Sequence, residues 1–188
     1  MKIIIIGVGG CGRNSLNNLV DLGIYPECTV YVDTDTNSLP ASKCHTNLTI
    51  GESLVGKIGT GANQELGRAA AELSKAEIEK MLEGADFVLI IAGLGAGVGS
   101  GATPFIAELV PKTAKLFAVV TTPADYEPKK RKDLANETLL RLYDVIGEEN
   151  VRVVRQASYV TCPITAAIER ADRAVTEAAR DILDTIAQ

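Results

Sequence analysis

The stretch that most restricts the possible fold is Ala92–Pro104, in which glycines alternate with other residues. A continuous apolar run, Phe87–Ala92, leads into it and predicts a buried strand. Pro104 suits the first turn of a helix, so the predicted order is strand, glycine loop and helix N-terminus. Free backbone N–H groups and the positive end of a helix dipole then converge, and the missing Cβ atoms let a phosphate approach. The stretch therefore predicts an anion site, since a plain turn needs only one or two glycines.

A second glycine loop, Gly7–Asn14, lies near the N-terminus. The apolar run Ile3–Ile6 precedes it and predicts a strand buried on both faces. The next predicted strand, Thr29–Asp33, ends on an acid about 20 residues beyond the loop, at the spacing of a dinucleotide-binding fingerprint. In that fingerprint the loop has the pattern G-x-G-x-x-G and the acid binds a ribose hydroxyl. One interpretation of the chain is therefore an NAD(P)-binding Rossmann domain, with Asp33 on the ribose.

Strands and helices alternate along the rest of the chain, which predicts an α/β fold with a parallel sheet covered by helices on both faces. Ser74 and Glu77 have the spacing of a capping box at a helix start. In parallel sheets of this kind, ligands bind at the carboxyl ends of the strands. The remaining predicted strands are Leu48–Ile50, Lys115–Thr121 and Val151–Arg155, and the predicted helices are one ending near Gly23, then Gln64–Leu73, Ser74–Leu82, Pro104–Val110, Lys129–Ile146 and Thr165–Ala187.

Composition excludes several classes of function. The 188 residues suit one α/β domain, residues 1–188. The net charge of −5 argues against a nucleic-acid binder. No stretch reaches the roughly 18 apolar residues of a membrane span, and the N-terminal apolar run is too short for a signal peptide. The four cysteines form no CxxC pair, so we expect free thiols and a cytoplasmic protein.

Five segments, in the right order, resemble the nucleotide-binding half of the FtsZ/tubulin GTPases. Gly95–Gly101 matches the family's Gly-Gly-Gly-Thr-Gly-Ser/Thr-Gly signature, and Gly7–Asn14 is similar to its first phosphate-side loop. Asp33-Thr34-Asp35 stands where FtsZ proteins carry Asn-Thr-Asp. Gly59–Gly67 resembles the loop that senses the γ-phosphate, and Tyr126–Arg131 resembles Phe-Glu-Gly-Lys-Lys-Arg. The resemblance implies the Rossmann-like, tubulin/FtsZ type of GTPase domain, ending in the central helix.

This resemblance also implies the ligand, GTP or GDP with Mg²⁺, and the residues that hold it. Asp35 would hold Mg²⁺ through water, Glu127 would bind ribose, and Arg131 would offset phosphate charge. The full set implied as nucleotide-binding is Gly9, Gly10, Cys11, Gly12, Asn14, Asp33, Asp35, Gly59, Gly61, Ala62, Asn63, Gly95, Ala96, Gly97, Val98, Gly99, Ser100, Gly101, Glu127, Arg131, Ile168 and Asp172.

The chain departs from the family pattern at several of these positions. Val98 replaces the signature's Thr, and Ala96 replaces a Gly, which narrows the allowed backbone angles. On the last helix, Ile168 and Asp172 stand where the family stacks an aromatic on guanine and places an Asn. A carboxylate can accept from the N1–H and N2–H groups of guanine, so we expect guanine. The family's upstream Asn falls near Gln156 or near Ile164.

The sequence stops where the family's central helix ends, before the loop with the catalytic acids and before the second domain. The resemblance therefore implies half an active site and no catalytic residue in this chain. Hydrolysis would need a catalytic loop from a neighbouring subunit or an FtsZ-like partner, and the isolated chain would be a weak GTPase at most. An alternative is a regulator or capper of FtsZ-like filaments, which would bind a filament end through its nucleotide face.

Overall fold

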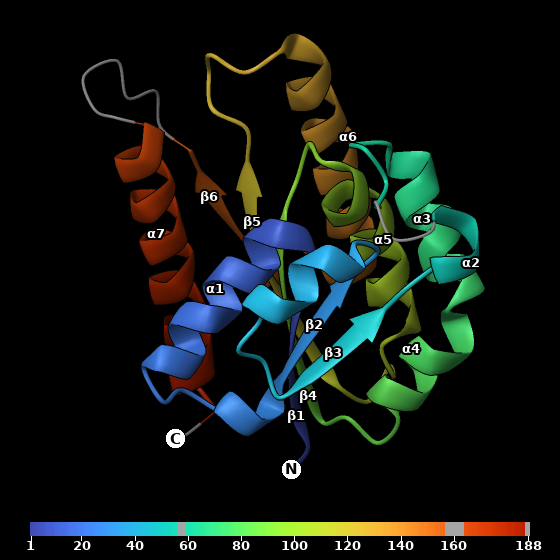
Figure 1. The fold of residues 1–188 in the computed structure, drawn as a ribbon. Helices are drawn as coiled ribbons and strands as arrows, with labels where there is room; N and C mark the ends of the chain where they lie inside the picture. The colour runs from blue at the N-terminus through green and yellow to red at the C-terminus, as the bar shows by residue number, and fades with distance from the viewer. Residues whose placement is uncertain (56–58, 157–163, 187–188) are drawn as a thin grey trace.

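The computed structural model describes residues 1–55, 59–156 and 164–186 of the chain. The central element is a six-stranded sheet in the order β3-β2-β1-β4-β5-β6, in which all pairings are parallel (Figure 1). The predicted parallel sheet is therefore confirmed. The strands are β1 Ile3–Val8, β2 Thr29–Asp33, β3 Thr46–Thr49, β4 Phe87–Gly93, β5 Lys115–Thr122 and β6 Val151–Arg155.

Burial increases from the edges of the sheet to its centre. The central strands β1 and β4 are almost wholly buried, whereas the edge strands β3 and β6 are partly exposed. The continuous Ile, Val and Leu runs of the central strands suit this position because both faces are covered. Phe87 at the start of β4 also stacks on Phe117 of β5, with ring centroids 5.4 Å apart.

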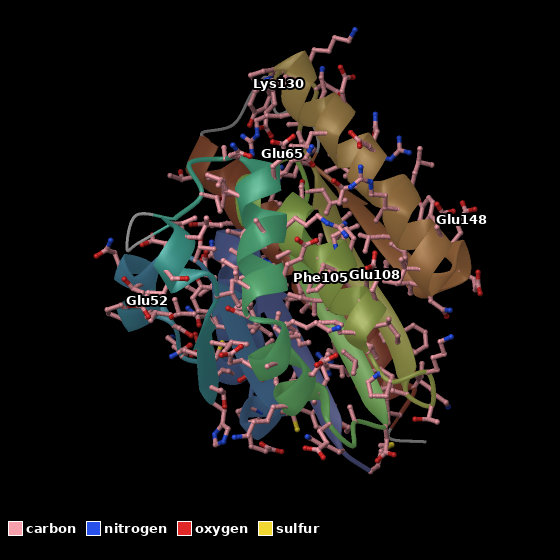
Figure 2. The ribbon with its side chains drawn as sticks, turned by 90° about the vertical axis from the view of Figure 1, so that its right-hand side faces the viewer. Glu52, Glu65, Phe105, Glu108, Lys130 and Glu148 are labelled. Atoms are coloured by element: carbon pink, nitrogen blue, oxygen red, sulfur yellow. The ribbon has the colours of Figure 1, made fainter. Side chains whose placement is uncertain are left out.

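Helices cover the sheet in two layers. On one face, α1 and α7 pack together over a core that includes Leu16 and Val175. On the other face, α3, α4 and α6 surround α5. Figure 2 shows this second face, with Glu65 on α3 and Phe105 on the neighbouring α5. The helices are α1 Gly9–Asp21, α2 Glu52–Val55, α3 Gln64–Leu73, α4 Lys75–Leu82, α5 Gly97–Leu109, α6 Lys129–Ile146 and α7 Ile164–Asp184.

Two helices begin earlier than the sequence predicts. Helix α5 begins at Gly97, so Pro104 lies inside it and not in its first turn, and α1 begins at Gly9 inside the first glycine loop. The predicted start at Pro104 is wrong because glycine's low helix propensity is outweighed here by close packing. A Cβ on Gly99 would overlap the carbonyl oxygen of Gly93, and one on Gly101 would overlap backbone of α3.

The predicted capping box is also wrong. Ser74 precedes α4 but makes no side-chain bond to the start of that helix. Its hydroxyl oxygen instead accepts a hydrogen bond from the backbone N–H of Gly51, at 3.0 Å. Gly51 precedes the short helix α2, which is not among the predicted helices. Ser74 therefore ties the segment after β3 to the junction of α3 and α4.

The sheet topology creates a junction between its two central strands. From β1 the chain crosses through α1 to β2, and from β4 it crosses through α5 to β5, on the other side of the sheet. These opposite crossovers place α1 and α5 on opposite faces, with both N-termini beside the carboxyl ends of β1 and β4. Figure 1 shows this edge at the end of the sheet away from both chain termini. Among the helices described, none is both long and apolar enough to cross a membrane.

Candidate functional site

A pocket of about 640 Å³ lies at the carboxyl edge of the sheet. Its lining comes from the carboxyl ends of β1, β2, β4 and β5 and the segments after them, from Gln156 after β6, from the loop before α3, and from the starts of α6 and α7. The predicted site residues that line it are Gly9, Gly10, Cys11, Asp33, Asp35, Gly59, Ala62, Ala96, Gly97, Val98, Gly99, Glu127, Arg131 and Ile168. Loops that are far apart in the sequence thus meet at one site, as the positions of the strands predict.

Two helix N-termini open into this pocket. The first three residues of α1, Gly9–Cys11, and the first three of α5, Gly97–Gly99, all line it. Neither helix has a side-chain cap, and the N-cap residues are Val8 and Ala96. First-turn N–H groups have no partner within their own helix, and the helix dipole adds positive charge there. Two such ends facing one cavity form a site for an anion with more than one charged group.

The backbone at these helix starts leaves room for a ligand. Gly9 has a φ of +71°, which an L side chain rarely adopts, and a Cβ on Gly10 would have no atom within 4 Å. Ala96 has a φ of −116° and a ψ of 171°, which any residue can adopt. We expected alanine at this position to restrict the backbone angles of the loop. It does not do so, because the extended backbone observed here does not require glycine.

Cys11 and Thr121 are two lining residues of the pocket whose side chains contact each other. The Cys11 Sγ lies 3.6 Å from the Thr121 Oγ1, so the thiol of α1 meets the hydroxyl at the end of β5. Burial raises the pKa of the Cys11 thiol, and the hydrogen bond to Thr121 partly opposes that effect. A neutral thiol here adds no negative charge to a site that faces two positive helix ends.

Several predicted glycines serve packing and do not line the pocket. A Cβ on Gly12 would lie 2.6 Å from the carbonyl oxygen of Ile91, so this glycine lets α1 sit directly on the sheet. A Cβ on Gly101 would overlap the carbonyl oxygen of Gln64, so this glycine lets α5 approach α3. The predicted site residues that do not line the pocket are Gly12, Asn14, Gly61, Asn63, Gly95, Ser100, Gly101 and Asp172.

Gly95 and Ser100 shape the turn between β4 and α5. Gly95 has a φ of +88°, and its N–H donates to the buried Ser100 Oγ at 2.7 Å. Its carbonyl oxygen accepts from the Arg131 Nε at 3.0 Å. The same guanidinium forms an ion pair with Glu127, whose other carboxylate oxygen accepts from the Ala124 N–H. Arg131 therefore links the glycine turn to the loop after β5 and holds Glu127 beside the pocket.

The loop before α3 carries unusual backbone angles. Gly59, Gly61 and Ala62 all have positive φ, at +82°, +55° and +66°. Ala62 is not glycine, so this angle stores strain of the kind found at ligand sites. Asn63 ends the loop by capping α3, with its side-chain oxygen accepting from the N–H groups of Glu65 and Leu66. The loop also packs on α5, because a Cβ on Gly97 would overlap the Thr60 hydroxyl.

Asp33, Thr34 and Asp35 form the turn after β2 and line the pocket. Asp33 is only 7% exposed, and its oxygens already accept hydrogen bonds from Tyr31 and from the N–H groups of Thr34 and Asp35. A ribose acid of the dinucleotide type would need free carboxylate oxygens, so this geometry speaks against that interpretation. Within the described residues, the fully buried Thr34 Oγ1 has no hydrogen-bond partner.

The same turn offers a donor set that fits Mg²⁺. No group of three or more His, Cys, Asp or Glu side chains in the described part of the chain could hold a metal. Asp35 and the unpartnered Thr34 hydroxyl nevertheless line the pocket next to the cradle for an anion. Mg²⁺ keeps much of its hydration shell and commonly takes one or two carboxylates together with phosphate oxygens. The site therefore suits a magnesium ion that arrives with a phosphate ligand.

Residues after β6 and on α7 complete the pocket lining. Ile168 on α7 is 49% exposed and lines the pocket, as does Gln156 after β6. Gln156 is one of the two positions left open for the family's upstream Asn. Asp172 lies one turn beyond Ile168 and is hydrogen-bonded to Asn14 of α1. Burial raises the pKa of Asp172, and the bond to Asn14 partly opposes this shift.

Sequence reasoning missed several lining residues next to those it identified. Apart from Thr60 in the loop before α3, they lie at the carboxyl ends of strands or in the segments that follow them, so the rule that ligands bind at this sheet edge could have found them. Tyr126 is 62% exposed beside Glu127. The lining residues that were missed are Val8, Thr34, Thr60, Gly93, Leu94, Thr121, Thr122, Pro123 and Tyr126.

Comparison with known proteins agrees with this geometry. Residues 2–148 match the model of the Tubulin/FtsZ family, GTPase domain. The chain is 33% identical over 191 residues to cell division protein FtsZ 2 of Methanocaldococcus jannaschii, covering 99% of this chain and 50% of that protein. It thus spans about half the length of this relative.

Solved structures show the same relationship. An empty FtsZ dimer of M. jannaschii aligns with a TM-score of 0.85 and 31% identity, over 97% of this chain and 54% of that one. The GTPγS-bound CetZ2 protofilament of Haloferax volcanii aligns with a TM-score of 0.82 and 23% identity, over 97% and 58%, and shows the shared fold. From the family match over most of its length, the identity to FtsZ 2 and the fold, this chain belongs to the Tubulin/FtsZ family and carries that family's GTPase domain.

Proposed function

We propose that this chain binds GTP and GDP in the pocket at the carboxyl edge of its sheet. The observation that carries the proposal is the pair of uncapped helix N-termini, α1 and α5, whose first three residues all line one cavity. Their free N–H groups would hold the α- and β-phosphates. The strained loop at Gly59–Ala62 would meet the γ-phosphate, since it packs against the start of α5.

Other residues would contact the ribose, the base and the magnesium ion. Glu127, held by Arg131 and by the Ala124 N–H, would accept from the ribose hydroxyls. Ile168 would cover one face of the base. Asp172 lies one turn farther along α7, outside the pocket lining, and would accept from the N1–H and N2–H groups of guanine. Asp35 and the Thr34 hydroxyl would hold Mg²⁺ through its water ligands. Mg²⁺, when bound, would neutralise phosphate charge.

We also propose that hydrolysis needs a group from outside this chain. In the described part of the pocket three carboxylates contribute to the lining. Asp33 accepts three hydrogen bonds from protein donors, Glu127 is paired with Arg131, and Asp35 is the proposed partner of Mg²⁺. Each of the three carboxylates thus already has another partner or role, which leaves the orientation of an attacking water to a group from outside this chain. The relatives include an FtsZ dimer and a CetZ2 protofilament, which makes a second subunit a natural source of that group. A second copy of this chain or a longer FtsZ-like protein would be the partner.

Calorimetric titration of the nucleotide-free chain tests the first proposal. GTP, GDP, ATP and NAD are each titrated with Mg²⁺ present. We expect heat of binding with GTP and GDP and none with ATP or NAD. Binding of NAD alone would contradict the proposal and would return Asp33 to the role of a ribose acid.

The rate of GTP turnover tests the second proposal. Turnover per chain is measured against protein concentration, with and without full-length FtsZ 2 of M. jannaschii, after that protein's own turnover is subtracted. We expect slow turnover by the dilute chain and a higher rate per chain as concentration rises or the relative is added. Fast turnover that does not depend on concentration would show a complete active site within one chain.

A further inference from the structure

A buried hydroxyl–carboxylate pair lies beneath the turn after β2. Tyr31 and Asp33 are two residues apart on β2, so their side chains point to the same face of the strand. Tyr31 is fully buried and Asp33 nearly so, and the Tyr31 hydroxyl donates to the Asp33 Oδ2. Burial raises the pKa of Tyr31 far above its usual range, and the hydrogen bond to Asp33 adds to this shift. The hydroxyl therefore stays protonated and remains a donor.

The other oxygen of Asp33 holds the backbone of the turn. Its Oδ1 accepts from the N–H of Thr34 at 2.7 Å and from the N–H of Asp35 at 3.3 Å. On the far side of the turn, the Ser38 Oγ lies 2.7 Å from both the Tyr31 hydroxyl and the Asp35 carbonyl oxygen. Asp33 therefore holds two N–H groups of the turn, and Ser38 holds one of its carbonyl groups. The Tyr31 hydroxyl contacts both of these side chains.

The Asp33–Asp35 turn also supports the loop before α3. A Cβ built on Gly59 would lie 3.3 Å from the Cβ of Asp35 and 3.4 Å from the Thr34 Oγ1. Gly59 therefore sits directly on the turn, and both segments line the pocket. A shift of the turn would displace the Asp35 carboxylate, the Thr34 hydroxyl and the surface on which Gly59 packs, all together.

We propose that Tyr31 and Asp33 are positioning residues that set the geometry of the magnesium and γ-phosphate end of the nucleotide pocket. They act through the Thr34–Asp35 turn and not by binding the ligand, because both side chains are buried and both oxygens of Asp33 already accept from protein donors. This inference rests on the proposed binding of GTP for its ligand. The structural half, that the pair fixes the turn, does not depend on any ligand.

The first test uses Tyr31→Phe in the nucleotide-free chain. Amide hydrogen exchange at Thr34 and Asp35 reports whether the turn is still held. We expect exchange at these two amides to be about fivefold faster, as for the loss of one supporting hydrogen bond. The control is Tyr143→Phe, which removes a hydroxyl from α6 about 18 Å along the helix from Arg131. Unchanged exchange in Tyr31→Phe would overturn the proposal, whether or not the chain binds nucleotide.

The second test compares triphosphate and diphosphate binding. In Tyr31→Phe we expect the Mg²⁺ concentration for half-maximal GTPγS binding to rise about tenfold, as for loss of an outer-shell partner of a metal ligand. Binding of GDP without Mg²⁺ should match the wild type, because the α1 and α5 N-termini are untouched. An equal loss for both nucleotides would indicate general damage to the pocket and would overturn the positioning role.

Asp33 variants keep the proposal testable if Tyr31→Phe does not fold. Asp33→Ala removes the acceptor and should reproduce both effects. Asp33→Asn keeps one acceptor oxygen for the Thr34 and Asp35 amides and can donate to Tyr31, so it should restore slow exchange. If the wild-type chain binds no nucleotide while the exchange results hold, the proposed function fails and the positioning of the turn stands. Fast exchange in Asp33→Asn equal to that in Asp33→Ala would contradict the assigned hydrogen bonds.

Discussion

The α-carbon of Gly101 on α5 lies directly against the carbonyl oxygen of Gln64 on α3, so that a Cβ at position 101 would overlap it. The backbone N–H of Arg68 would lie only 2.6 Å from the same Cβ. The two helices are thus in backbone contact where they cross. Because α3 follows the Gly59–Ala62 loop and α5 begins in the pocket, this contact joins two walls of the site.

Gly101→Ala should therefore destabilise the whole domain. The added methyl group has no space, and the obstructing atoms are backbone, which cannot rotate away as a flexible side chain would. Overpacking of this kind costs about 1–3 kcal/mol, and we expect the upper part of that range. Urea unfolding followed by circular dichroism measures the loss. A stability equal to that of the wild type would show that α3 and α5 are farther apart in solution.

Gly10→Ala makes the same change as Gly101→Ala, but at the pocket. Gly10 has an ordinary negative φ, and a Cβ there would meet no atom within 4 Å. Since alanine is also the better helix former, the free energy of unfolding should stay within about 1 kcal/mol of the wild type or rise. Affinity for GDP should fall, because the methyl group stands at the uncapped start of α1. Unchanged GDP affinity would place the phosphates elsewhere.

Ser74→Ala and Glu77→Ala distinguish the hydrogen bond seen in the structure from the capping box that the sequence predicts. Ser74→Ala leaves the Gly51 N–H without its acceptor, which should cost about 1–3 kcal/mol. Glu77 is exposed and makes no capping bond, so Glu77→Ala should cost less than about 0.5 kcal/mol. Denaturant unfolding of both variants measures these losses and so distinguishes the Ser74–Gly51 hydrogen bond from a capping box. Equal losses would favour a reciprocal cap in solution.

The sequence predicts the regular parts of this fold well. The bounds of β2, β6, α3 and α6 match their predicted ranges, because apolar periodicity and turn residues act locally there. The starts of α1 and α5 do not match, since local propensity places glycine outside a helix. What overrides propensity is contact with distant backbone, such as Gly12 on Ile91 and Gly101 on Gln64, and a single sequence does not show such contacts.

The candidate site was predictable in outline for a similar reason. Parallel strands bring their following loops to one edge, so the five segments named from sequence do meet in one pocket. A glycine in such a loop can serve either a ligand or close packing, and the sequence does not distinguish Gly10 from Gly12. The contact between Tyr31 and Asp33 was not predicted, although the sequence carries a signal for it. Residues two apart on a strand share a face, so a hydroxyl and a carboxylate at this spacing can meet.

The last prediction concerns pH and Asp172. Burial raises the pKa of this carboxyl in the folded chain, so the folded state binds its proton more tightly than the unfolded state. Its contribution to stability is therefore greatest below the ordinary pKa of 3.8 and is lost as pH rises through the raised value. Above that raised pKa the wild type carries a charged, half-buried carboxylate.

Asp172→Asn should therefore stabilise the nucleotide-free chain at pH 7 and should lose this advantage in acid, where the wild-type carboxyl is protonated. The amide has a single acceptor oxygen, which the Asn14 side chain and guanine would have to share, so GTP affinity should fall while stability rises. Urea midpoints between pH 4 and 8, about the range over which buried carboxyls titrate, measure the first effect, and calorimetry measures the second. Glu169→Gln removes the same charge from an exposed position on α7 and should change neither. A stability gain in Asp172→Asn that is constant with pH would mean that burial of the charge is not its cause.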